Sequence, residues 1–133
     1  MSGTPETFQA AWIANIKAET PITSLLGTPR EVREFMWQET DFIFPAVRVG
    51  LDFFPSIERC GPDDAEVHIK VFSDEKSSKE ATHIASLIYT TYHGKPFTQN
   101  GIRFSTVIVR DIKRPDRSIY AWEREITIFC QGV

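Results

Sequence analysis

Histidine and acidic side chains at helical spacing are the first candidates for metal chemistry in this chain. Glu80 and His83 have the i, i+3 spacing that di-iron helical bundles use, but such bundles need two of these pairs and two further glutamates. A single pair on the exposed side of one helix is much more often solvated surface, so we expect no metal there. His68 and His93 have no partner at a similar spacing. We expect His68 to point from a strand to water or an interface, and His93 to lie in the last turn of a helix, where a cation suits the helix dipole.

The two cysteines, Cys60 and Cys130, are the candidates for nucleophilic chemistry. Neither lies in a recognisable nucleophile motif, and the sequence alone cannot bring a histidine and an acid to either thiol. A secreted domain held by disulfides would carry more cysteines at closer spacing. We therefore expect two free thiols in a reducing cytoplasm, with Cys130 packed in the last strand as a small core residue. A disulfide between the two cysteines is the less favoured alternative.

Two acidic segments complete the search for chemistry. The joint between a strand and a helix at Ser73 to Glu80 contains three acids and no glycine, so it would repel the phosphate of a nucleotide. Asp63 and Asp64 follow a Gly-Pro step, and acids in such a loop usually keep it soluble. We therefore expect no catalytic residue, no cofactor and no metal, and a protein that is not an enzyme.

Length and composition predict one domain that spans residues 1–133. The chain has 133 residues, of which 41% are hydrophobic, and this is enough to bury a single core. Its formal net charge of -3 argues against nucleic-acid binding as the main task, since such domains usually carry a basic excess. No apolar run approaches the roughly 18 residues of a membrane span. The first residues lack the basic and apolar regions of a secretory signal.

The N-terminal region predicts a helix that ends near Glu19. Thr4 is suited to cap it, and proline is favoured at its first position, where Pro5 stands. One further turn from Ile22 to Leu26, closed by Gly27, can follow. One face of the helix is apolar and consists of Phe8, Ala11, Trp12 and Ile16.

A second amphipathic helix is expected after Ser77. Ser77 and Glu80 have the spacing of a capping box. Gly94 stands where a left-handed closing residue is wanted. The buried stripe of this helix should consist of Ala81, Ile84, Ala85, Ile88 and Tyr92.

Alternating apolar and polar residues predict a hairpin of two strands. The first strand spans Ala46–Phe54, and the second lies around Val67–Val71. They should pair antiparallel across a loop from Pro55 to Asp64, which is longer than most connections. A short strand or extended segment from Arg30 to Trp37 precedes them.

Two further strands are expected at Ile102–Val109 and Ser118–Cys130, separated by a polar turn at Asp111–Arg117. One face of the last strand is apolar and consists of Tyr120, Trp122, Ile126, Ile128 and Cys130. Strands with interspersed helices and hairpin-length connections predict an α+β fold. The expected architecture is a mostly antiparallel sheet of four to five strands with two main helices packed on it.

Large apolar residues gather at both ends of the first hairpin strand: Trp37, Phe42, Phe44, Phe53, Phe54 and Ile57. One account is that they cover the sheet edge within the monomer, and this account is slightly favoured. The other is a subunit interface, where aromatic residues are enriched. The charged segment Asp111–Arg117 likewise suits a solvated turn, which we favour, or the polar rim of an interface.

The order and spacing of several motifs resemble the tail terminator (tail completion) proteins of long-tailed bacteriophages across nearly the whole chain. The family's leading amphipathic helix corresponds to Phe8–Ile16, and its strand introduced by a proline corresponds to Phe44-Pro-Ala-Val-Arg-Val-Gly50. A hairpin partner that ends in a hydrophobic-serine step into the central helix corresponds to Val71-Phe-Ser73 and Ala81–Ala85. The arginine of the family's final strand corresponds to Arg124.

The resemblance implies a structural protein that assembles rather than reacts. Such proteins form a ring, typically of six subunits, on the head-proximal end of the tail tube. The ring stops tube polymerisation and offers a surface to the head-completion (stopper) proteins, and DNA passes through it without specific binding. The resemblance also implies a place in the virion, at the tail or neck, after assembly in the host cytoplasm. The chain departs from the pattern at Ala46, where an aromatic residue is usual, and in its lack of a Gly-rich turn before the central helix.

A cyclic ring requires two different patches on each subunit that match each other. The candidate interface residues lie in the loop after the first hairpin strand and in the polar turn: Phe53, Phe54, Ile57, Arg59, Asp63, Asp64, Arg110, Lys113, Arg114, Asp116 and Arg117. Two other interpretations stay open. One is another phage neck or head–tail connector protein of similar α+β build. The other is a small ligand-binding or enzymatic domain, which predicts a pocket with converging polar groups.

Overall fold

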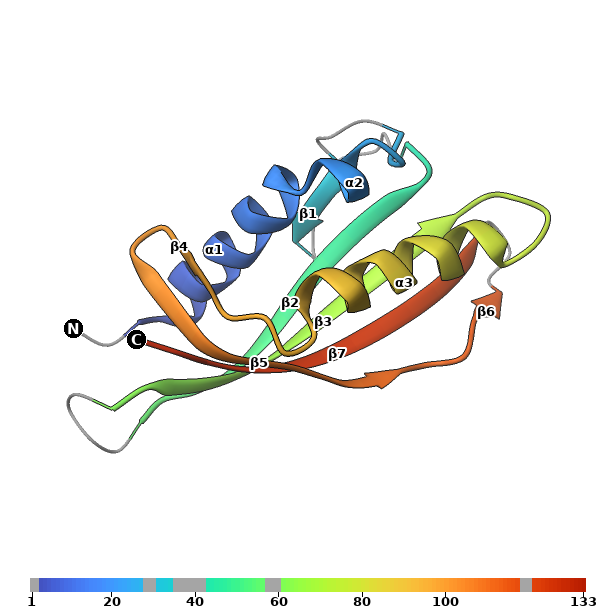
Figure 1. Cartoon of the computed structure of the whole chain (residues 1–133). Coiled ribbons are helices and arrows are strands. Elements are labelled where there is room, and N and C mark those ends of the chain that lie inside the picture. The colour runs from blue at the N-terminus through green and yellow to red at the C-terminus, as the bar shows by residue number, and fades with distance from the viewer. Residues whose placement is uncertain (1–2, 28–30, 35–42, 57–60, 118–120) are drawn as a thin grey trace.

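The computed structural model describes residues 3–27, 31–34, 43–56, 61–117 and 121–133 (Figure 1). Three helices and seven strands occur in these ranges. The helices are α1 (Pro5–Ala18), α2 (Thr20–Thr23) and α3 (Lys79–Tyr92). The strands are β1 (Val32–Glu34), β2 (Ala46–Phe54), β3 (Asp63–Ser73), β4 (Phe97–Gln99), β5 (Ile102–Ile112), β6 (Asp116–Arg117) and β7 (Trp122–Gly132).

The strands form a single mixed sheet in the order β1-β2-β3-β7-β5-β4, and β6 pairs with the start of β7. β1 runs parallel to β2, and every other pair is antiparallel. The predicted antiparallel hairpin of β2 and β3 is confirmed, as is the α+β fold class. The predicted number of strands, four to five, is too low. β1 falls within the short strand or extended segment predicted at Arg30–Trp37. Two further strands of only two or three residues, β4 and β6, add to the sheet in the described ranges.

All three helices lie on one face of the sheet, which we call the inner face (Figure 1). α1 packs on β1, β2 and β4, whereas α3 packs on β3, β5 and β7. Both predicted helical stripes are buried against the sheet. Alternate residues of the long strands point into the same core, as in β3, where Ala65, Val67, Ile69 and Val71 are fully buried.

Aromatic rings fill the space between α1 and the β4–β5 end of the sheet. The rings of Phe8, Trp12, Tyr92, Phe97 and Phe104 have centroids 4.9 to 5.7 Å apart. These are the separations at which aromatic pairs attract each other by more than the area they bury. The cluster fixes the position of α1 on the sheet.

The N-terminal caps of the two main helices differ from each other. Thr4 caps α1 as predicted, because its hydroxyl accepts the N–H of Thr7 at 3.1 Å and the hydroxyl of Thr7 accepts the N–H of Thr4 at 2.9 Å. The capping box predicted at Ser77 and Glu80 was wrong. α3 begins after Ser78, whose side chain makes no capping hydrogen bond, and the Glu80 carboxylate instead accepts the hydroxyl of Ser73 at 2.7 Å.

The C-terminal end of α3 joins the helix to the outer edge of β5. Gly94 has a φ of +70°, which confirms the left-handed closing residue. Its N–H donates to the carbonyl of Val107 at 2.8 Å, and the N–H of Val109 donates to Nδ1 of His93 at 3.1 Å. His93 also stacks on Tyr89, with ring centroids 4.9 Å apart. His93 is therefore the C-terminal cap, one residue beyond the last turn in which it was expected, and it binds the sheet edge.

Three loop predictions need correction. β3 begins at Asp63, so Asp63 and Asp64 belong to a strand and not to the loop before it. β5 continues to Ile112, and Asp116–Arg117 pairs with β7, so most of the predicted polar turn is strand. The short second helix covers Thr20–Thr23, two residues earlier than its predicted start. None of the described helices has both the length and the apolar character that a membrane span needs.

Candidate functional site: the two ends of the sheet

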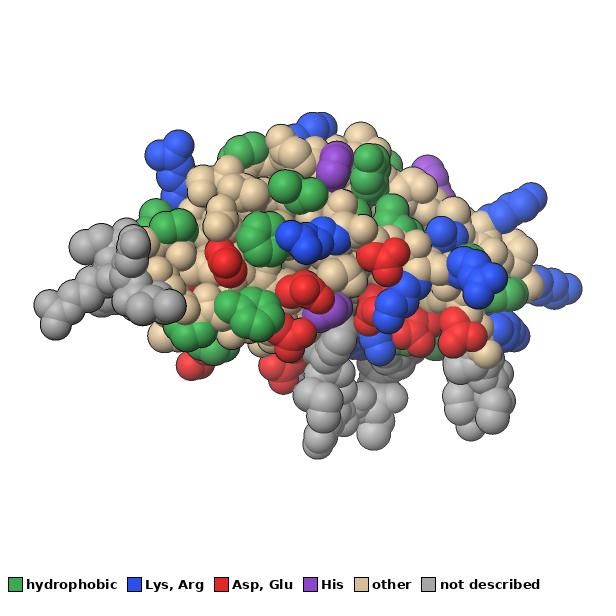
Figure 2. Space-filling model, turned by 90° about the horizontal axis from the view of Figure 1, so that it is seen from below, with side chains coloured by type: hydrophobic (Ala, Val, Ile, Leu, Met, Phe, Trp, Pro, Cys, Tyr) green, Lys and Arg blue, Asp and Glu red, His purple; other side chains and the backbone are tan. Residues whose placement is uncertain are grey.

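The face of the sheet opposite the helices, which we call the outer face, carries mainly charged and polar side chains (Figure 2). Neighbouring strands place charges of opposite sign side by side. Lys70 Nζ lies 3.1 Å from Glu123 Oε1, and Lys113 Nζ lies 2.7 Å from Glu125 Oε2. The hydrogen bond with the Glu125 carboxylate, followed by its charge, raises the pKa of Lys113. In Figure 2 lysines and arginines gather at the end of the molecule away from the β2–β3 hairpin.

The first candidate patch is the hairpin end, which we define as residues 52–56 and 61–66. Phe53 points to the inner face, where its ring lies 5.0 Å from that of Phe8, whereas Phe54 is 53% exposed. Phe53 therefore covers the core of its own subunit, and Phe54 is free for a partner. The alternation of the strand predicts this difference, because Phe53 is an even number of residues from the buried Val47 and Val49 and so points to the same face. Ile57 lies outside the described residues, as does Arg59.

The two acids of the hairpin end are already bonded within the chain. Asp63 is 1% exposed, and its carboxylate accepts the N–H of Gly3 at 3.1 Å and that of Ser56 at 2.7 Å. Asp64 Oδ1 accepts Nε2 of Gln131 at 2.8 Å. The expectation that these acids merely solvate a loop was wrong. Because a fully buried carboxylate cannot face a neighbour, Asp63 is removed from the candidate interface.

The second candidate patch is the basic corner, which we define as residues 110–117. The guanidinium of Arg110 lies 4.7 Å from the ring centroid of Phe129, and that of Arg117 lies 5.6 Å from the ring of Trp122. These cation–π contacts hold two long side chains against the sheet. A polar hollow of about 170 Å³ adjoins them and is lined by Lys70, Lys113, Arg114, Asp116, Glu123 and Glu125.

The two patches lie at opposite ends of the sheet (Figure 1). Asp64 pairs with Gln131 of β7, whereas Asp116 pairs with Glu123, eight residues earlier in the same strand. At a rise of about 3.4 Å per residue, the patches are roughly 27 Å apart. Among the described candidates, Asp116 and Arg117 thus lie far from the hairpin end. Arg110 does not, because its guanidinium lies over Phe129, the strand partner of Glu66 in the hairpin end.

The two patches also differ in charge. The described residues of the hairpin end include four acids, Asp52, Asp63, Asp64 and Glu66, and no basic side chain, a formal charge of -4. Residues 110–117 contain four basic and two acidic side chains, a formal charge of +2. Opposite ends of the molecule therefore carry opposite charge, which favours head-to-tail contact between copies.

A buried salt bridge on β2 was missed by the sequence analysis. Arg48 alternates with the apolar Val47 and Val49, a pattern typical of a solvent-exposed polar side chain, yet it is only 4% exposed, and its Nη2 lies 3.1 Å from Oε2 of Glu31. Its Nη1 donates to the Glu31 carbonyl at 2.8 Å, and Arg33 lies 3.7 Å from the other carboxylate oxygen of Glu31. Burial lowers the pKa of Arg48, and the hydrogen bond with Glu31 opposes this effect. The pair fastens β1 to β2.

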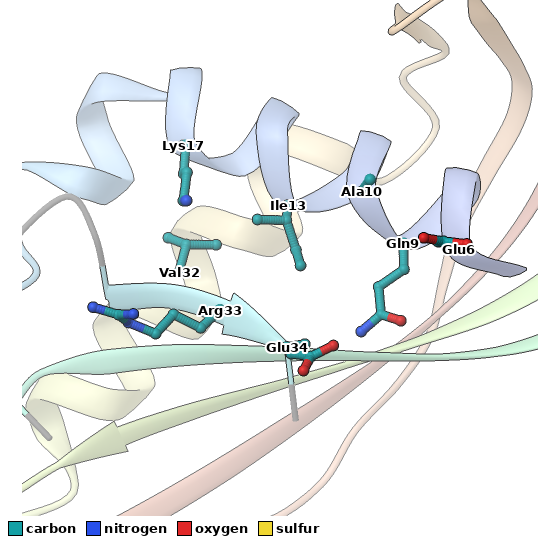
Figure 3. Close-up of a pocket in the computed structure, with 8 residues that line it drawn as sticks. All are labelled: Glu6, Gln9, Ala10, Ile13, Lys17, Val32, Arg33 and Glu34. Carbon is teal, nitrogen blue, oxygen red and sulfur yellow. The ribbon is translucent and has the colours of Figure 1, made fainter. Parts of the chain in front are cut away.

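A groove of about 510 Å³ lies between α1 and β1 (Figure 3). It is the place to look for the pocket that a ligand-binding or enzymatic domain would have. Ile13 and Val32 form its apolar part. Its polar groups do not meet at one point, since the ends of Arg33 and Gln9 lie far apart (Figure 3). The amide of Gln9 donates to the carbonyl of Val49 at 3.0 Å and so binds the sheet. Among the residues that the structure describes, the lining of the groove does not bring its polar groups to one point, as a ligand-binding site would.

The residues considered above for nucleophilic or metal chemistry pack in the core, bond to neighbouring side chains or lie exposed on a helix. Cys130 is a free, fully buried thiol, and burial raises its pKa to about 12, so it stays protonated at neutral pH and packs as a core residue. Cys60 lies outside the described residues. Glu80 is engaged by Ser73, and His83 is exposed on α3.

No protein-family model matches the chain, and no curated protein matches it. Solved structures do share its fold. A chain of the virion of native gene transfer agent particle is 16% identical, has a TM-score of 0.75, and is covered over 92% of its length by 93% of this chain. A second solved structure, of a protein without a functional name, is 13% identical with a TM-score of 0.68 over 98% of this chain and 96% of its own. At these identities the likeness shows a common fold.

Proposed function

We propose that this chain is a structural virion protein that acts as a tail terminator. As such it forms a ring at the head-proximal end of a phage tail tube, ends tube polymerisation, and joins the tail to the head-completion proteins. Two independent lines support the proposal. The order of sequence motifs resembles that family, and the fold is shared over nearly the whole chain with a virion component. On this proposal the protein is not an enzyme and needs no cofactor.

The main structural support for the proposed ring is the pair of patches at opposite ends of the sheet. In a ring each subunit meets its neighbours through two different surfaces, and these must be complementary. The acidic hairpin end of one copy can meet the basic corner of the next, with Phe54 as the exposed apolar anchor. Six copies are the number that the family resemblance implies. DNA would pass through the ring without specific binding, in keeping with the net charge of -3.

Molar mass in solution across a wide protein concentration range, with particle imaging, tests the proposal. We expect closed rings, either alone or after addition of tail-tube protein, and rings bound to tube ends in the images. A strict monomer that binds neither tube ends nor head-completion protein would reject it. Binding to head-completion protein without capping of the tube would instead identify another neck or connector protein.

Phe54→Ser tests the interface itself, with Phe53→Ser as the matched control. Phe54 is exposed, so its replacement should leave the free energy of unfolding within about 0.5 kcal/mol and abolish the rings. Phe53 packs on Phe8, so its replacement should lower the free energy of unfolding by about 2 kcal/mol. Rings that form normally with Phe54→Ser would exclude this residue from the interface.

A further inference from the structure

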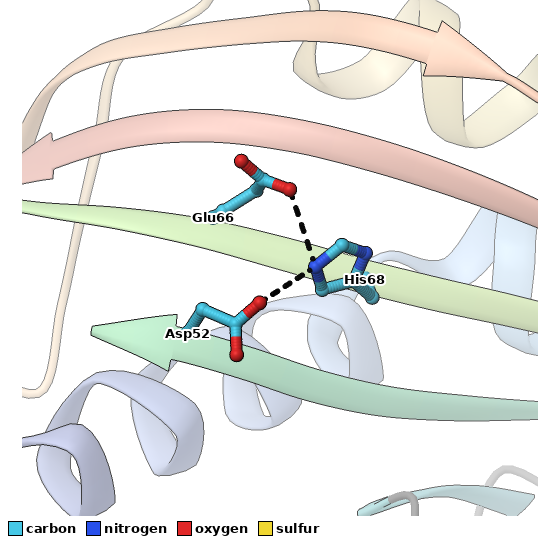
Figure 4. Close-up of side chains that lie close together, drawn as sticks. All are labelled: Asp52, Glu66 and His68. Atoms are coloured by element: carbon cyan, nitrogen blue, oxygen red, sulfur yellow. Dashed lines mark hydrogen bonds and ion pairs between the residues drawn. The ribbon is translucent and has the colours of Figure 1, made fainter. Parts of the chain in front are cut away.

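Three side chains from two neighbouring strands meet on the outer face of the sheet (Figure 4). His68 Nε2 lies 3.1 Å from Oδ2 of Asp52 and 3.3 Å from Oε1 of Glu66. One donor atom of each residue lies within 4.8 Å of the other two. A single imidazole nitrogen therefore faces two carboxylates at once.

The sheet itself builds this arrangement. Glu66 and His68 are two residues apart on β3 and so point to the same face, and Asp52 of β2 pairs directly with Glu66. Both strands are continuous at these positions, so the three backbone sites are held by the antiparallel ladder and not by a loop. The cluster cannot be read from residue spacing, because Asp52 and His68 are brought together only by the pairing of β2 with β3.

The environment of His68 suits a metal ligand. Its Nδ1 lies 3.4 Å from the hydroxyl of Thr127 on the next strand, β7. With the ring proton on Nδ1 and donated to that hydroxyl, the lone pair of Nε2 points toward the two carboxylates. A hydrogen bond from the second ring nitrogen is the usual support of a metal-binding histidine. In the part of the chain that the structure describes, no lysine or arginine nitrogen lies within 4 Å of the carboxylate of Asp52 or Glu66.

We propose that Asp52, Glu66 and His68 bind one divalent ion of the zinc class. Zinc bonds of about 2.0 to 2.2 Å to nitrogen and oxygen place ligand atoms about 3.3 to 3.5 Å apart in a tetrahedral site, close to the two measured separations. The imidazole nitrogen selects zinc or a similar transition metal over magnesium and calcium, which prefer oxygen ligands alone. The side chain of Asp52 is 66% exposed, so an ion can enter from solvent and keep a water as its fourth ligand.

The alternative to a metal ion is a proton on Nε2 of His68. A positively charged imidazole would give the same two distances through ion pairs. Measured zinc affinity distinguishes the metal site from the ion pairs. A metal site binds zinc tightly and only while all three ligands are present, whereas a protonated imidazole in ion pairs would bind none. This inference does not depend on ring formation.

Calorimetric titration of the full chain with zinc sulfate tests the site, in a Cys60→Ser background that removes a competing thiol. We expect one zinc per chain at neutral pH, a rise in melting temperature with zinc, and a Co²⁺ complex with visible absorption. Magnesium and calcium should give no comparable signal. His68→Ala and Asp52→Asn should each weaken zinc binding about 100-fold, and Asp52 is exposed enough that its variant will fold.

His83→Ala is the matched control, because His83 also has an acid three residues away, on α3, and is exposed. This variant should bind zinc as tightly as the parent chain. Absence of stoichiometric zinc binding in the parent would overturn the proposal. The proposal would also be overturned if zinc bound normally to both the His68→Ala and the Asp52→Asn variant. Loss of zinc binding in His83→Ala as large as in His68→Ala would have the same consequence.

Discussion

At the scale of single residues, the Arg48–Glu31 pair shows what a sequence can and cannot reveal. Alternation in β2 placed Arg48 correctly on the face away from the helices. It could not show that Arg48 is buried, because Glu31 reaches it only through the parallel pairing of β1 with β2. A charged residue in an alternating strand is ordinarily expected to be exposed to solvent. Its burial is tolerable only when a residue of opposite charge from another segment of the chain pairs with it.

Removal of the carboxylate should therefore be costly. Glu31→Gln removes the carboxylate charge that lies 3.1 Å from the buried guanidinium of Arg48, and we expect a loss of about 3 kcal/mol in the free energy of unfolding. Urea denaturation measures this change. Glu34→Gln, at an exposed position of the same strand, should change the value by less than about 0.5 kcal/mol. Equal effects of the two substitutions would show that the salt bridge contributes nothing particular.

At the scale of elements, long periodic segments were predictable and short ones were not. The stripes of α1 and α3 and the alternation of β3 and β7 bury apolar groups over many residues, so their period identifies them. β4 and β6 have two or three residues each, too few for a period to appear. They exist because neighbouring strands offer hydrogen bonds, which is a property of the assembled sheet. The hairpin end was located correctly, but its acids were assigned to a loop because the strand extends beyond the apolar pattern.

The different caps of α1 and α3 give a test at this scale. Thr4→Ala removes the hydroxyl that accepts the N–H of Thr7, and we expect a loss of about 1 kcal/mol in stability. Ser78→Ala should have almost no effect, since the Ser78 side chain makes no capping hydrogen bond. Thermal or urea unfolding compares the two. A larger loss for Ser78→Ala than for Thr4→Ala would contradict the assignment of the caps.

At the scale of the whole molecule, the proposed contact between copies follows from the separation of charge between the two ends of the sheet. Both candidate segments were identifiable from the sequence as charged or aromatic breaks in regular patterns. Their placement at opposite ends was not, because it follows from the order of strands in the sheet. Which of two adjacent phenylalanines is exposed was in principle readable from the alternation of the strand, as Phe53 and Phe54 show.

If opposite charges hold neighbouring subunits, ring formation should depend on salt. The Debye length falls from about 10 Å at 0.1 M salt to about 3 Å at 1 M, so attraction between exposed charges weakens. We expect Arg114→Glu, within the basic corner, to raise the concentration needed for ring assembly about tenfold at low salt. Arg103→Glu, exposed on β5 outside the corner, is the control and should change it little. Sedimentation velocity at several salt concentrations measures the shift, and identical behaviour of both variants would argue against the charged interface.

The contacts of His93 and Gly94 with β5 have a consequence for colloidal behaviour. An open strand edge invites any other extended chain to add to it, and proteins that crowd together are exposed to this hazard. Here the end of α3 occupies two of the hydrogen-bonding positions on the outer edge of β5. Part of this edge is thereby closed to the addition of another strand, so that copies assembled as proposed would meet through side chains rather than through strand pairing.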